Sequence, residues 1–598
     1  MSGQYDVLIK DTTIVDGTGK AAFRGSVGMK GEKIAAAGDI QGDAARVIDG
    51  SGLVTCPGFV DPHSHADFSI LGYPLAENLV MQGITTVLGG NCGFSLAPVK
   101  RTEYVKGMMG GLGAGVQIDL DWRTFGEWLT RVEETGSSVN YVPLVGHNTL
   151  RGALMGEDFK RKATADEIEA MKELLHGAMK DGAFGLSAGL DAAWPGHFAD
   201  VDEELVELVK IAQQYGGLFS PHTRHHQNQW PVDDPSDYGY GIFHAPTGEI
   251  IAGRYHGLLE AVEISRKANR AQLLIAHFTP AYIIPQPHPG FLDEAAARAT
   301  LVDIIDKARD EGLDVTYNVI AWSQSIAKES PVMGSFFSAR LALPEWLKAM
   351  DEDAFAIKIK TRAFRDRVRE VIYSGKFKFN MIHPLTDPYW MDCFKVLRCK
   401  NKAYEGKTIG DIARDRQPDN IIQAVYDESV EIVFDILSED PDATWADIID
   451  KREYGALSVF LDHPAGMPCT DVSALSAAPS REERRLVYGV SPTAYGLYPH
   501  YLRLFVKEKG VLSLEEAIKK ATSVPAQEVL GLQDRGVIKE GACADIVVFD
   551  FEQLREGEDF LEPAQPPQGI EHVLVNGTVV YEKMAHTGEK PGKVLRRS

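Results

Sequence analysis

The middle of the chain alternates short apolar strands with amphipathic helices, and this alternation limits the possible fold more than any other feature. Apolar segments such as 83–90, 216–222 and 272–278 recur, and helix-like segments such as 165–182 and 202–217 lie between several of them. Strands that are apolar on both faces are typical of a parallel sheet covered by helices on both sides. About eight such units fit a chain of 598 residues. We therefore predict an α/β fold built on a TIM-type (β/α)8 barrel.

Both ends of the chain are rich in β-forming residues. Segment 5–14 is apolar and β-branched and precedes an Asp-Gly-Thr-Gly turn, while segment 570–582 contains an Asn-Gly turn between two apolar runs. Because the two ends resemble each other, we expect residues 1–56 and 535–598 to assemble into one small β-sandwich-like domain. Residues 57–534 would then form the barrel.

Six side chains that can bind a metal follow predicted strands, at the end where a barrel carries its chemistry. They are His63, His65, Cys92, His222, His277 and Asp471. His63 and His65 are one residue apart, so on an extended strand they share a face. Each of the other donors, taken alone, equally fits a buried structural residue. Imidazole, thiolate and carboxylate together suit Zn²⁺, either as one ion or as two ions that share Cys92.

The overall composition narrows the class of protein and the choice of partner. A formal net charge of −23 disfavours nucleic acid, because phosphate binding requires a basic face. The N-terminal stretch MSGQYDVLIKD contains no signal-like apolar core, and no segment reaches the roughly 20 apolar residues of a membrane span. The six cysteines form no C-x-x-C pair, so we expect reduced thiols and a cytoplasmic protein. The expected partners are a small-molecule substrate and further copies of the chain in a homo-oligomer.

Several motifs resemble a known enzyme family. The segments PGFVDPHSHAD, GITTVLGGNCGFSLAP, SPHTR and TDVSAL are similar to those of the amidohydrolase superfamily, specifically its D-aminoacylase branch, the N-acyl-D-amino-acid deacylases. Similar segments extend from one end of the chain to the other, so the resemblance covers most of the sequence. The G-N-C-G and P-G-F-x-D-x-H-x-H motifs together are specific for this branch.

The resemblance implies a metal-dependent amidohydrolase that cleaves an amide carbon–nitrogen bond with zinc-activated water. It implies that His63 and His65 bind one metal position and that Cys92, His222 and His277 bind the other. Asp471 would be the catalytic carboxylate near the metal, accepting a proton from water and passing it to the leaving amine.

Three segments depart from the D-aminoacylase pattern. The family's H-x-K, H-P-R and Y-P-Y segments are replaced here by 277–279 (HFT), 491–493 (SPT) and 317–319 (YNV). Two cations and a hydroxyl expected around a substrate carboxylate are therefore missing, although Arg224 remains. Because binding a carboxylate through two hydrogen bonds favours such cations, we expect an N-acyl amino acid or a related, less anionic amide as substrate.

Two long connections, near 225–256 and 278–292, should project from the catalytic face. Their aromatic residues favour a lid over a bulky substrate, and a loop that packs on a neighbouring subunit is the alternative. The candidate substrate-binding residues are Arg224, His147, Trp194, Trp322 and Ser323. His147 also fits a hydrogen-bonded core histidine.

Two other functions fit the same residues. A hydrolase of cyclic amides or lactones needs the same attack by water, so the sequence does not separate it from a hydrolase of open-chain amides. A catalytically inactive barrel that serves as a scaffold is the other alternative, although members of that kind have lost metal ligands and all six donors are present here.

Overall fold

The computed structural model describes residues 4–112, 116, 118–190, 194–224, 243–244, 250–251, 253–278, 291–322, 329–337, 343–373, 377, 389–447, 455–479, 491–557 and 564–597. Helices and strands alternate through much of the chain, which confirms the predicted α/β class. The two predicted connections near 225–256 and 278–292 lie largely outside the described residues. Of the helices in the described ranges, none has the length and apolar character needed to cross a membrane.

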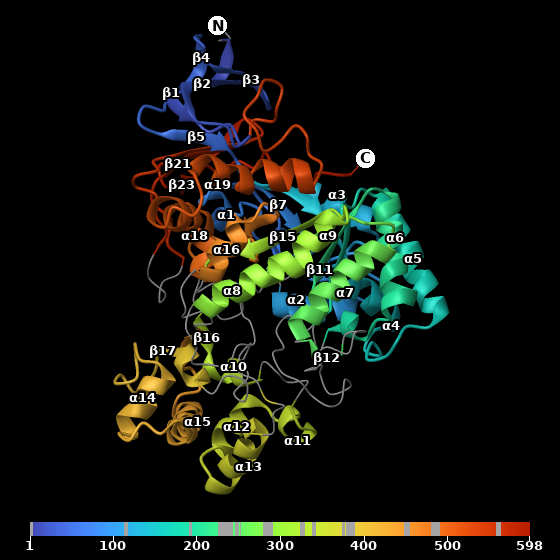
Figure 1. Cartoon of the computed structure of the whole chain (residues 1–598), viewed down its shortest axis with the longest axis vertical. Helices are drawn as coiled ribbons and strands as arrows, with labels where there is room; N and C mark the ends of the chain where they lie inside the picture. The colour runs from blue at the N-terminus through green and yellow to red at the C-terminus, as the bar shows by residue number, and fades with distance from the viewer. Residues whose placement is uncertain are drawn as a thin grey trace.

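Two parallel sheets occupy the centre of the molecule (Figure 1). The first contains β6 (Phe59–Asp61), β7 (Ile84–Gly89) and β8 (Asn140–Pro143). The second contains β9 (Val145–Gly146), β10 (Gly185–Gly189), β11 (Leu218–His222), β14 (Leu273–Ile275), β15 (Val315–Ile320) and β19 (Gly466–Cys469). Each strand pairs with the next one in chain order, and all of these strands are buried, as expected for apolar strands covered on both faces.

The two sheets are connected at both of their free edges. Only Leu144 separates β8 from β9, so one sheet continues into the other along the chain. At the opposite edge, the carboxylate of Asp61 at the end of β6 accepts a hydrogen bond from the backbone N–H of Thr470, which follows β19. The backbone N–H of Asp471 donates to the carbonyl of His63 at 2.9 Å. The ends of the first and the last strand are therefore held together.

The connecting helices begin where the sequence provides a cap. Helix α5 (Ala165–Lys180) follows Thr164, whose hydroxyl accepts from the backbone N–H of Glu167 while the Glu167 carboxylate accepts from the Thr164 backbone. Its residues Ile168, Met171 and Leu175, spaced by three or four positions, are buried. This spacing places one apolar stripe of the helix against the core.

The remaining helices of the described residues follow the same chain order. They are α1 (Glu77–Val80), α2 (Thr102–Leu112), α3 (Phe125–Thr135), α4 (His147–Met155), α6 (Glu207–Gln214), α7 (Gly253–Lys267), α8 (Phe291–Thr300), α9 (Lys307–Asp310), α10 (Val332–Phe337), α11 (Glu345–Lys348), α12 (Glu352–Lys358), α13 (Arg362–Tyr373), α14 (Ile409–Arg416), α15 (Ile422–Glu439), α16 (Gly455–Asp462), α18 (Pro492–Tyr501) and α19 (Leu514–Ala521).

Strands from both ends of the chain share one sheet. It contains β1 (Tyr5–Ile14), β2 (Phe23–Lys30), β3 (Lys33–Gly38), β4 (Ala44–Asp49), β5 (Val54–Pro57), β20 (Ile546–Phe549), β21 (Ile570–Val575), β22 (Thr578–Glu582) and β23 (Ala585–His586). The two ends meet where β5 pairs with β1 on one side and with β20 on the other. The predicted Asn-Gly turn joins β21 to β22, with positive φ at both Asn576 and Gly577. Because only Gly58 separates β5 from β6, this sheet is joined directly to the parallel strands.

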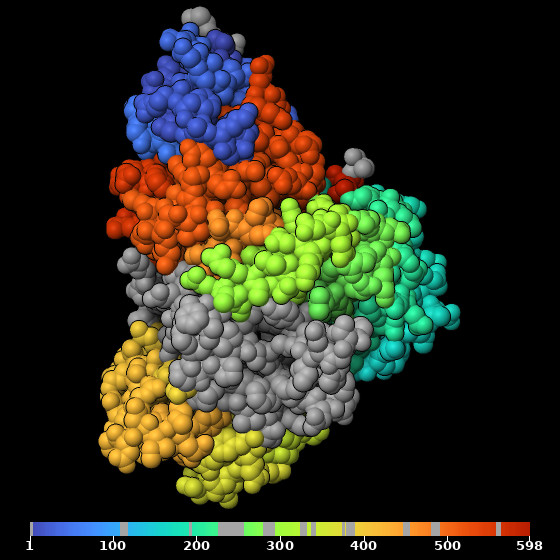
Figure 2. Space-filling model, viewed as in Figure 1, coloured from blue at the N-terminus to red at the C-terminus, as the bar shows by residue number. Residues whose placement is uncertain are grey.

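A third group of elements has a hydrophobic core of its own. Strands β16 (Glu329–Pro331), β17 (Phe394–Arg398) and β18 (Thr444–Asp447) form a small sheet, and helices α10 to α15 surround it. This group lies between β15 and β19 in the sequence and at the opposite end of the molecule from the terminal sheet (Figure 2). The sequence analysis had not separated this insertion from the rest of 57–534.

Candidate metal centre

The six predicted donors all lie at the carboxyl ends of parallel strands. His63 and His65 follow β6, and Cys92 follows β7. His222 is the last residue of β11, and His277 comes two residues after β14. Asp471 follows β19 in the same way. Parallel strands end at one edge of a sheet, so five strands deliver their donors to the same place.

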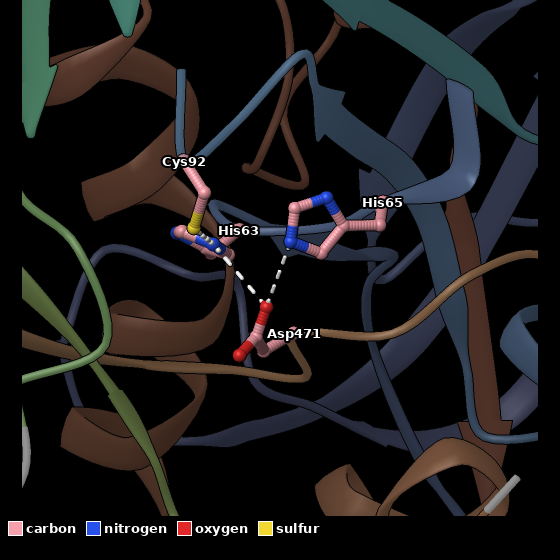
Figure 3. A group of neighbouring side chains, drawn as sticks. All are labelled: His63, His65, Cys92 and Asp471. Carbon is pink, nitrogen blue, oxygen red and sulfur yellow. Dashed lines mark hydrogen bonds and ion pairs between the residues drawn. The ribbon is translucent and has the colours of Figure 1, made fainter. Parts of the chain in front are cut away.

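The structure places four of these donors in one group (Figure 3). One ligand atom from each of His63, His65, Cys92 and Asp471 lies within 4.8 Å of the others. Oδ1 of Asp471 is 3.3 Å from Nε2 of His63 and 3.2 Å from Nε2 of His65. Sγ of Cys92 lies 3.4 Å from Nε2 of His63. Figure 3 shows the carboxylate of Asp471 pointing toward both imidazoles, with Cys92 against His63.

A second group shares Cys92 with the first. Sγ of Cys92 is 3.6 Å from Nδ1 of His222 and 3.3 Å from Nε2 of His277, and these two nitrogens are 2.8 Å apart. All three side chains are buried. The thiol therefore lies between two sets of histidines, where it can complete either set or both.

The spacing of these atoms fits a metal ion better than a hydrophobic contact. Four ligands placed tetrahedrally about 2.0 to 2.3 Å from zinc would be roughly 3.3 to 3.7 Å from one another. The distances from Cys92 and Asp471 to their neighbours, 3.2 to 3.6 Å, are close to this range. The nitrogens of His222 and His277 are closer, at hydrogen-bond distance. The donor types and their spacing together fit zinc.

Three of the six donors have an unusual backbone conformation. Cys92, His277 and Asp471 have φ values of 53°, 31° and 56°, in a region that non-glycine residues rarely adopt. Such a conformation costs about 1–3 kcal/mol per residue and is concentrated at functional sites. Asn318 on β15 supports one of these turns, because its Oδ1 accepts a hydrogen bond from the backbone N–H of His277 at 2.6 Å.

The electrostatics of the site favour a bound cation. Burial lowers the pKa of His63, and burial together with His222 holds the pKa of His277 well below its usual range, so both imidazoles keep a free lone pair. Burial alone would raise the pKa of Asp471, but His63 and its neighbours hold it well below the ordinary value. Burial raises the pKa of the Cys92 thiol, and a nearby cation is what would favour its thiolate.

Two predicted substrate-binding residues lie beside this centre. The Trp194 indole packs on the imidazole of His222, with ring centroids 4.4 Å apart, and is only partly buried. Arg224 follows β11, but its Nε donates to both carboxylate oxygens of Glu260 at 2.9 and 3.0 Å. Its guanidinium also donates to the carbonyl of His197. The charge of Arg224 is thus already paired within the protein.

The other predicted substrate-binding residues lie in different surroundings. Nε2 of His147 is 2.7 Å from Oε1 of Glu204, and the same carboxylate accepts from Arg151; all three side chains are fully buried. Trp322 stacks on His500 with ring centroids 4.1 Å apart. Ser323 lies outside the described residues.

The sequence analysis missed the polar side chains that support the donors. Asp61 accepts hydrogen bonds from the backbone N–H groups of His63 and Thr470, and so joins the first donor strand to the last. Asn91 donates to the carbonyls of Ser64 and Leu88 at 3.1 and 2.7 Å. Both residues lie inside the motifs that contain the donors, directly before Cys92 or two positions before His63. A polar residue next to a ligand was therefore the available signal.

Comparisons with known proteins agree with this arrangement. The model of the amidohydrolase family matches residues 46–359 and 488–581. A D-aminoacylase of Alcaligenes xylosoxydans xylosoxydans is 27% identical and the alignment covers 100% of this chain and 99% of the relative. An uncharacterized protein of Mycobacterium tuberculosis (strain ATCC 25618 / H37Rv) is 32% identical, with 96% and 89% covered.

A solved structure shares the fold over almost the whole chain. It is the N-acyl-D-glutamate deacylase from Bordetella bronchiseptica, in complex with zinc and a phosphonate inhibitor that mimics the tetrahedral intermediate of the reaction. It is 25% identical, with a TM-score of 0.67, and 99% of each chain is covered. The predicted resemblance is confirmed: the chain belongs to the amidohydrolase family, in its D-aminoacylase branch.

Proposed function

We propose that this chain is a zinc-dependent enzyme that hydrolyses an amide carbon–nitrogen bond. The observation that carries this proposal is the convergence of six ligand atoms, from five parallel strands, in two groups that share Cys92. Membership of the amidohydrolase family makes the chain a hydrolase of carbon–nitrogen bonds other than peptide bonds. The solved relative that contains zinc supports the choice of metal.

We propose that the two parallel sheets form one eight-stranded barrel, with β8 and β9 as a single interrupted strand. The hydrogen bonds from Thr470 to Asp61 and from Asp471 to His63 support closure between β19 and β6. The terminal nine-stranded sheet would be the small β domain at the amino-terminal face of this barrel. The barrel holds the metal ligands at its other end.

The first group would hold one ion and the second would hold another, or a single ion would occupy one of them. When bound, zinc makes water more acidic and polarises the amide carbonyl. Asp471 has the position and charge of the general base. It is the least buried donor of its group, with 14% of its side chain exposed, and its pKa stays well below the usual range. The same carboxylate would return the proton to the leaving nitrogen, because an amine leaves poorly unless it is protonated.

We propose an N-acyl amino acid or a related bulky amide as the substrate. The relatives named D-aminoacylase and N-acyl-D-glutamate deacylase support an acylated amino group. The pairing of Arg224 with Glu260 supports a substrate less anionic than theirs, because this arginine already has a carboxylate partner. Trp194, partly exposed beside His222, would contact an apolar part of the substrate.

The test combines metal content with a substrate panel. Purified protein should contain one or two zinc ions per chain by elemental analysis, and a chelator should remove activity that added zinc restores. The panel should include N-acyl-D-amino acids, the corresponding amides without a carboxylate, cyclic imides and lactones. We expect hydrolysis of open-chain amides, including those without a carboxylate. Hydrolysis of cyclic substrates only would replace the proposal with a cyclic amidase, and protein without zinc or activity would indicate a scaffold.

A further inference from the structure

The loop that contains Cys92 is held in a conformation that its own sequence does not favour. Cys92 has φ of 53° although it is not a glycine, and its thiol must face histidines from three different strands. A residue in this conformation is kept there only by its surroundings. The contacts around residues 90–93 therefore decide where the sulfur lies.

Ser187, in the middle of β10, makes the closest side-chain contact with this loop. Its hydroxyl accepts a hydrogen bond from the backbone N–H of Gly93 at 3.0 Å and donates to the carbonyl of Gly90 at 2.5 Å. One fully buried hydroxyl thus joins both ends of the turn that contains Cys92. Ser187 touches none of the six donors through a printed side-chain hydrogen bond, so any effect on the metal must pass through the loop backbone.

Asn148 on α4 holds the loop from a second direction. Its Nδ2 donates to the carbonyl of Cys92 at 3.4 Å, and its Oδ1 accepts from the backbone N–H of Gly196 at 2.8 Å. The loop also lies too close to β10 for a side chain to fit there. A Cβ on Gly189 would come within 2.2 Å of the Cys92 carbonyl oxygen.

We infer that Ser187 and Asn148 are positioning residues that keep the Cys92 sulfur between the two histidine groups, so that one thiolate serves both metal positions. This inference rests on the proposed function, because it concerns the same metal centre. Groups that orient a ligand without touching the metal typically change metal affinity by about 10- to 100-fold. We therefore expect loss of the Ser187 hydroxyl to weaken metal binding by about this factor and to weaken the sulfur–metal contact in particular.

The experiment replaces zinc with cobalt(II), whose bond to a thiolate gives a charge-transfer absorption band in the near ultraviolet. Metal-free wild type, Ser187→Ala and Ser220→Ala are titrated with cobalt(II), and thermal unfolding of each metal-free protein is recorded. Ser220 is a matched control: it lies on the adjacent strand β11, directly opposite Ser187 in the pairing, and is equally buried. Its hydroxyl has no hydrogen-bond partner among the described residues.

The inference predicts a normal band and affinity in Ser220→Ala, and a weaker band with about 10- to 100-fold lower affinity in Ser187→Ala. A Ser187→Ala protein with the wild-type band and affinity would overturn the inference and leave the proposed function intact. Absence of the band from the wild type would overturn both. If Ser187→Ala does not fold, Asn148→Ala removes the donor to the Cys92 carbonyl and is judged by the same two results.

Discussion

Replacing Asp471 with asparagine tests the proposed chemistry most directly. Oδ1 of Asp471 lies 3.3 and 3.2 Å from the imidazoles of His63 and His65, and 14% of its side chain is exposed, against 0% and 3% for those histidines. It is therefore the donor of its group that an incoming substrate can best approach. Asparagine has the same shape and keeps an oxygen donor, but its amide cannot accept a proton at neutral pH.

The expected loss follows from the role of this carboxylate. General acid–base catalysis contributes about 10² to 10⁴ in rate. At about 1.4 kcal/mol per factor of ten, Asp471→Asn should raise the activation free energy by about 3 to 5 kcal/mol. Zinc content should change little, because His63, His65 and Cys92 remain in the same group.

The assay measures kcat and KM on the best amide of the panel, together with zinc per chain. We expect kcat to fall by at least 100-fold at nearly unchanged zinc content. Asp314→Asn is a suitable control, since Asp314 directly precedes β15 at the opposite end of the parallel strands. Full activity in Asp471→Asn, or a loss of activity that only follows a loss of zinc, would refute the assignment of Asp471 as the general base.

Three further variants test the centre and its surroundings. Cys92→Ser should reduce zinc affinity by more than the about 10- to 100-fold typical of an outer partner, because Cys92 belongs to both donor groups; equilibrium dialysis measures this. Glu204→Gln should reduce the free energy of unfolding in urea by about 3–5 kcal/mol, since it leaves the buried guanidinium of Arg151 uncompensated. Glu556→Gln should cost up to about 3 kcal/mol at pH 7, and the difference from wild type should decrease as the pH falls from about 4.5 to about 2.

The sign of the pH effect follows from the surroundings of Glu556. Burial alone would raise the pKa of Glu556, but hydrogen bonds from His500 and Arg503 lower it to about 2, below the ordinary value of 4.5. The ionised form therefore stabilises the fold above pH 4.5, and this contribution is lost as the carboxylate takes up a proton. Glu508→Gln is the matched control, because Glu508 also accepts from Arg503 but is exposed, where an ion pair contributes about 0–1 kcal/mol. Equal pH dependence in the two variants would contradict this account, and a Glu204→Gln protein as stable as wild type would contradict the other.

The strands could be predicted because their pattern is local. The predicted segment 83–90 contains β7 (Ile84–Gly89), 216–222 contains β11 (Leu218–His222), and 313–321 contains β15 (Val315–Ile320). In each case an apolar, largely β-branched run ends at a glycine or a polar residue, and that information lies within a few residues. The donors could be predicted for the same reason, since each one directly follows such a run.

The insertion between β15 and β19 could not be separated by the same reasoning. Helices α13 and α15 have buried apolar stripes like those of the helices that cover the parallel strands. An amphipathic pattern shows that a helix has a buried face, but it does not show which core that face meets. Only the contacts place Phe336, Trp390 and Trp445 in a separate cluster.

Pairings between distant residues were also beyond the sequence. Arg224 was expected near the substrate because it follows a donor strand, yet Glu260, which pairs with it, comes 36 residues later. His147 likewise ends a strand, and its partner Glu204 is 57 residues away. The position of a residue at a strand end can be read locally, whereas the partner of its side chain depends on how the helices pack.

The backbone at the donors explains why side chains from separate strands meet at one point. Successive side chains on a strand alternate between the two faces of the sheet, so strand geometry alone does not turn them toward one centre. Cys92, His277 and Asp471 lie two or three residues beyond their strands, and each has the left-handed φ that changes the chain direction there. Glycine would adopt this conformation without strain, but glycine has no ligand atom. The chain keeps a strained residue at each of these turns because the turn and the donor are needed at the same position, which is how strain becomes concentrated at a functional site.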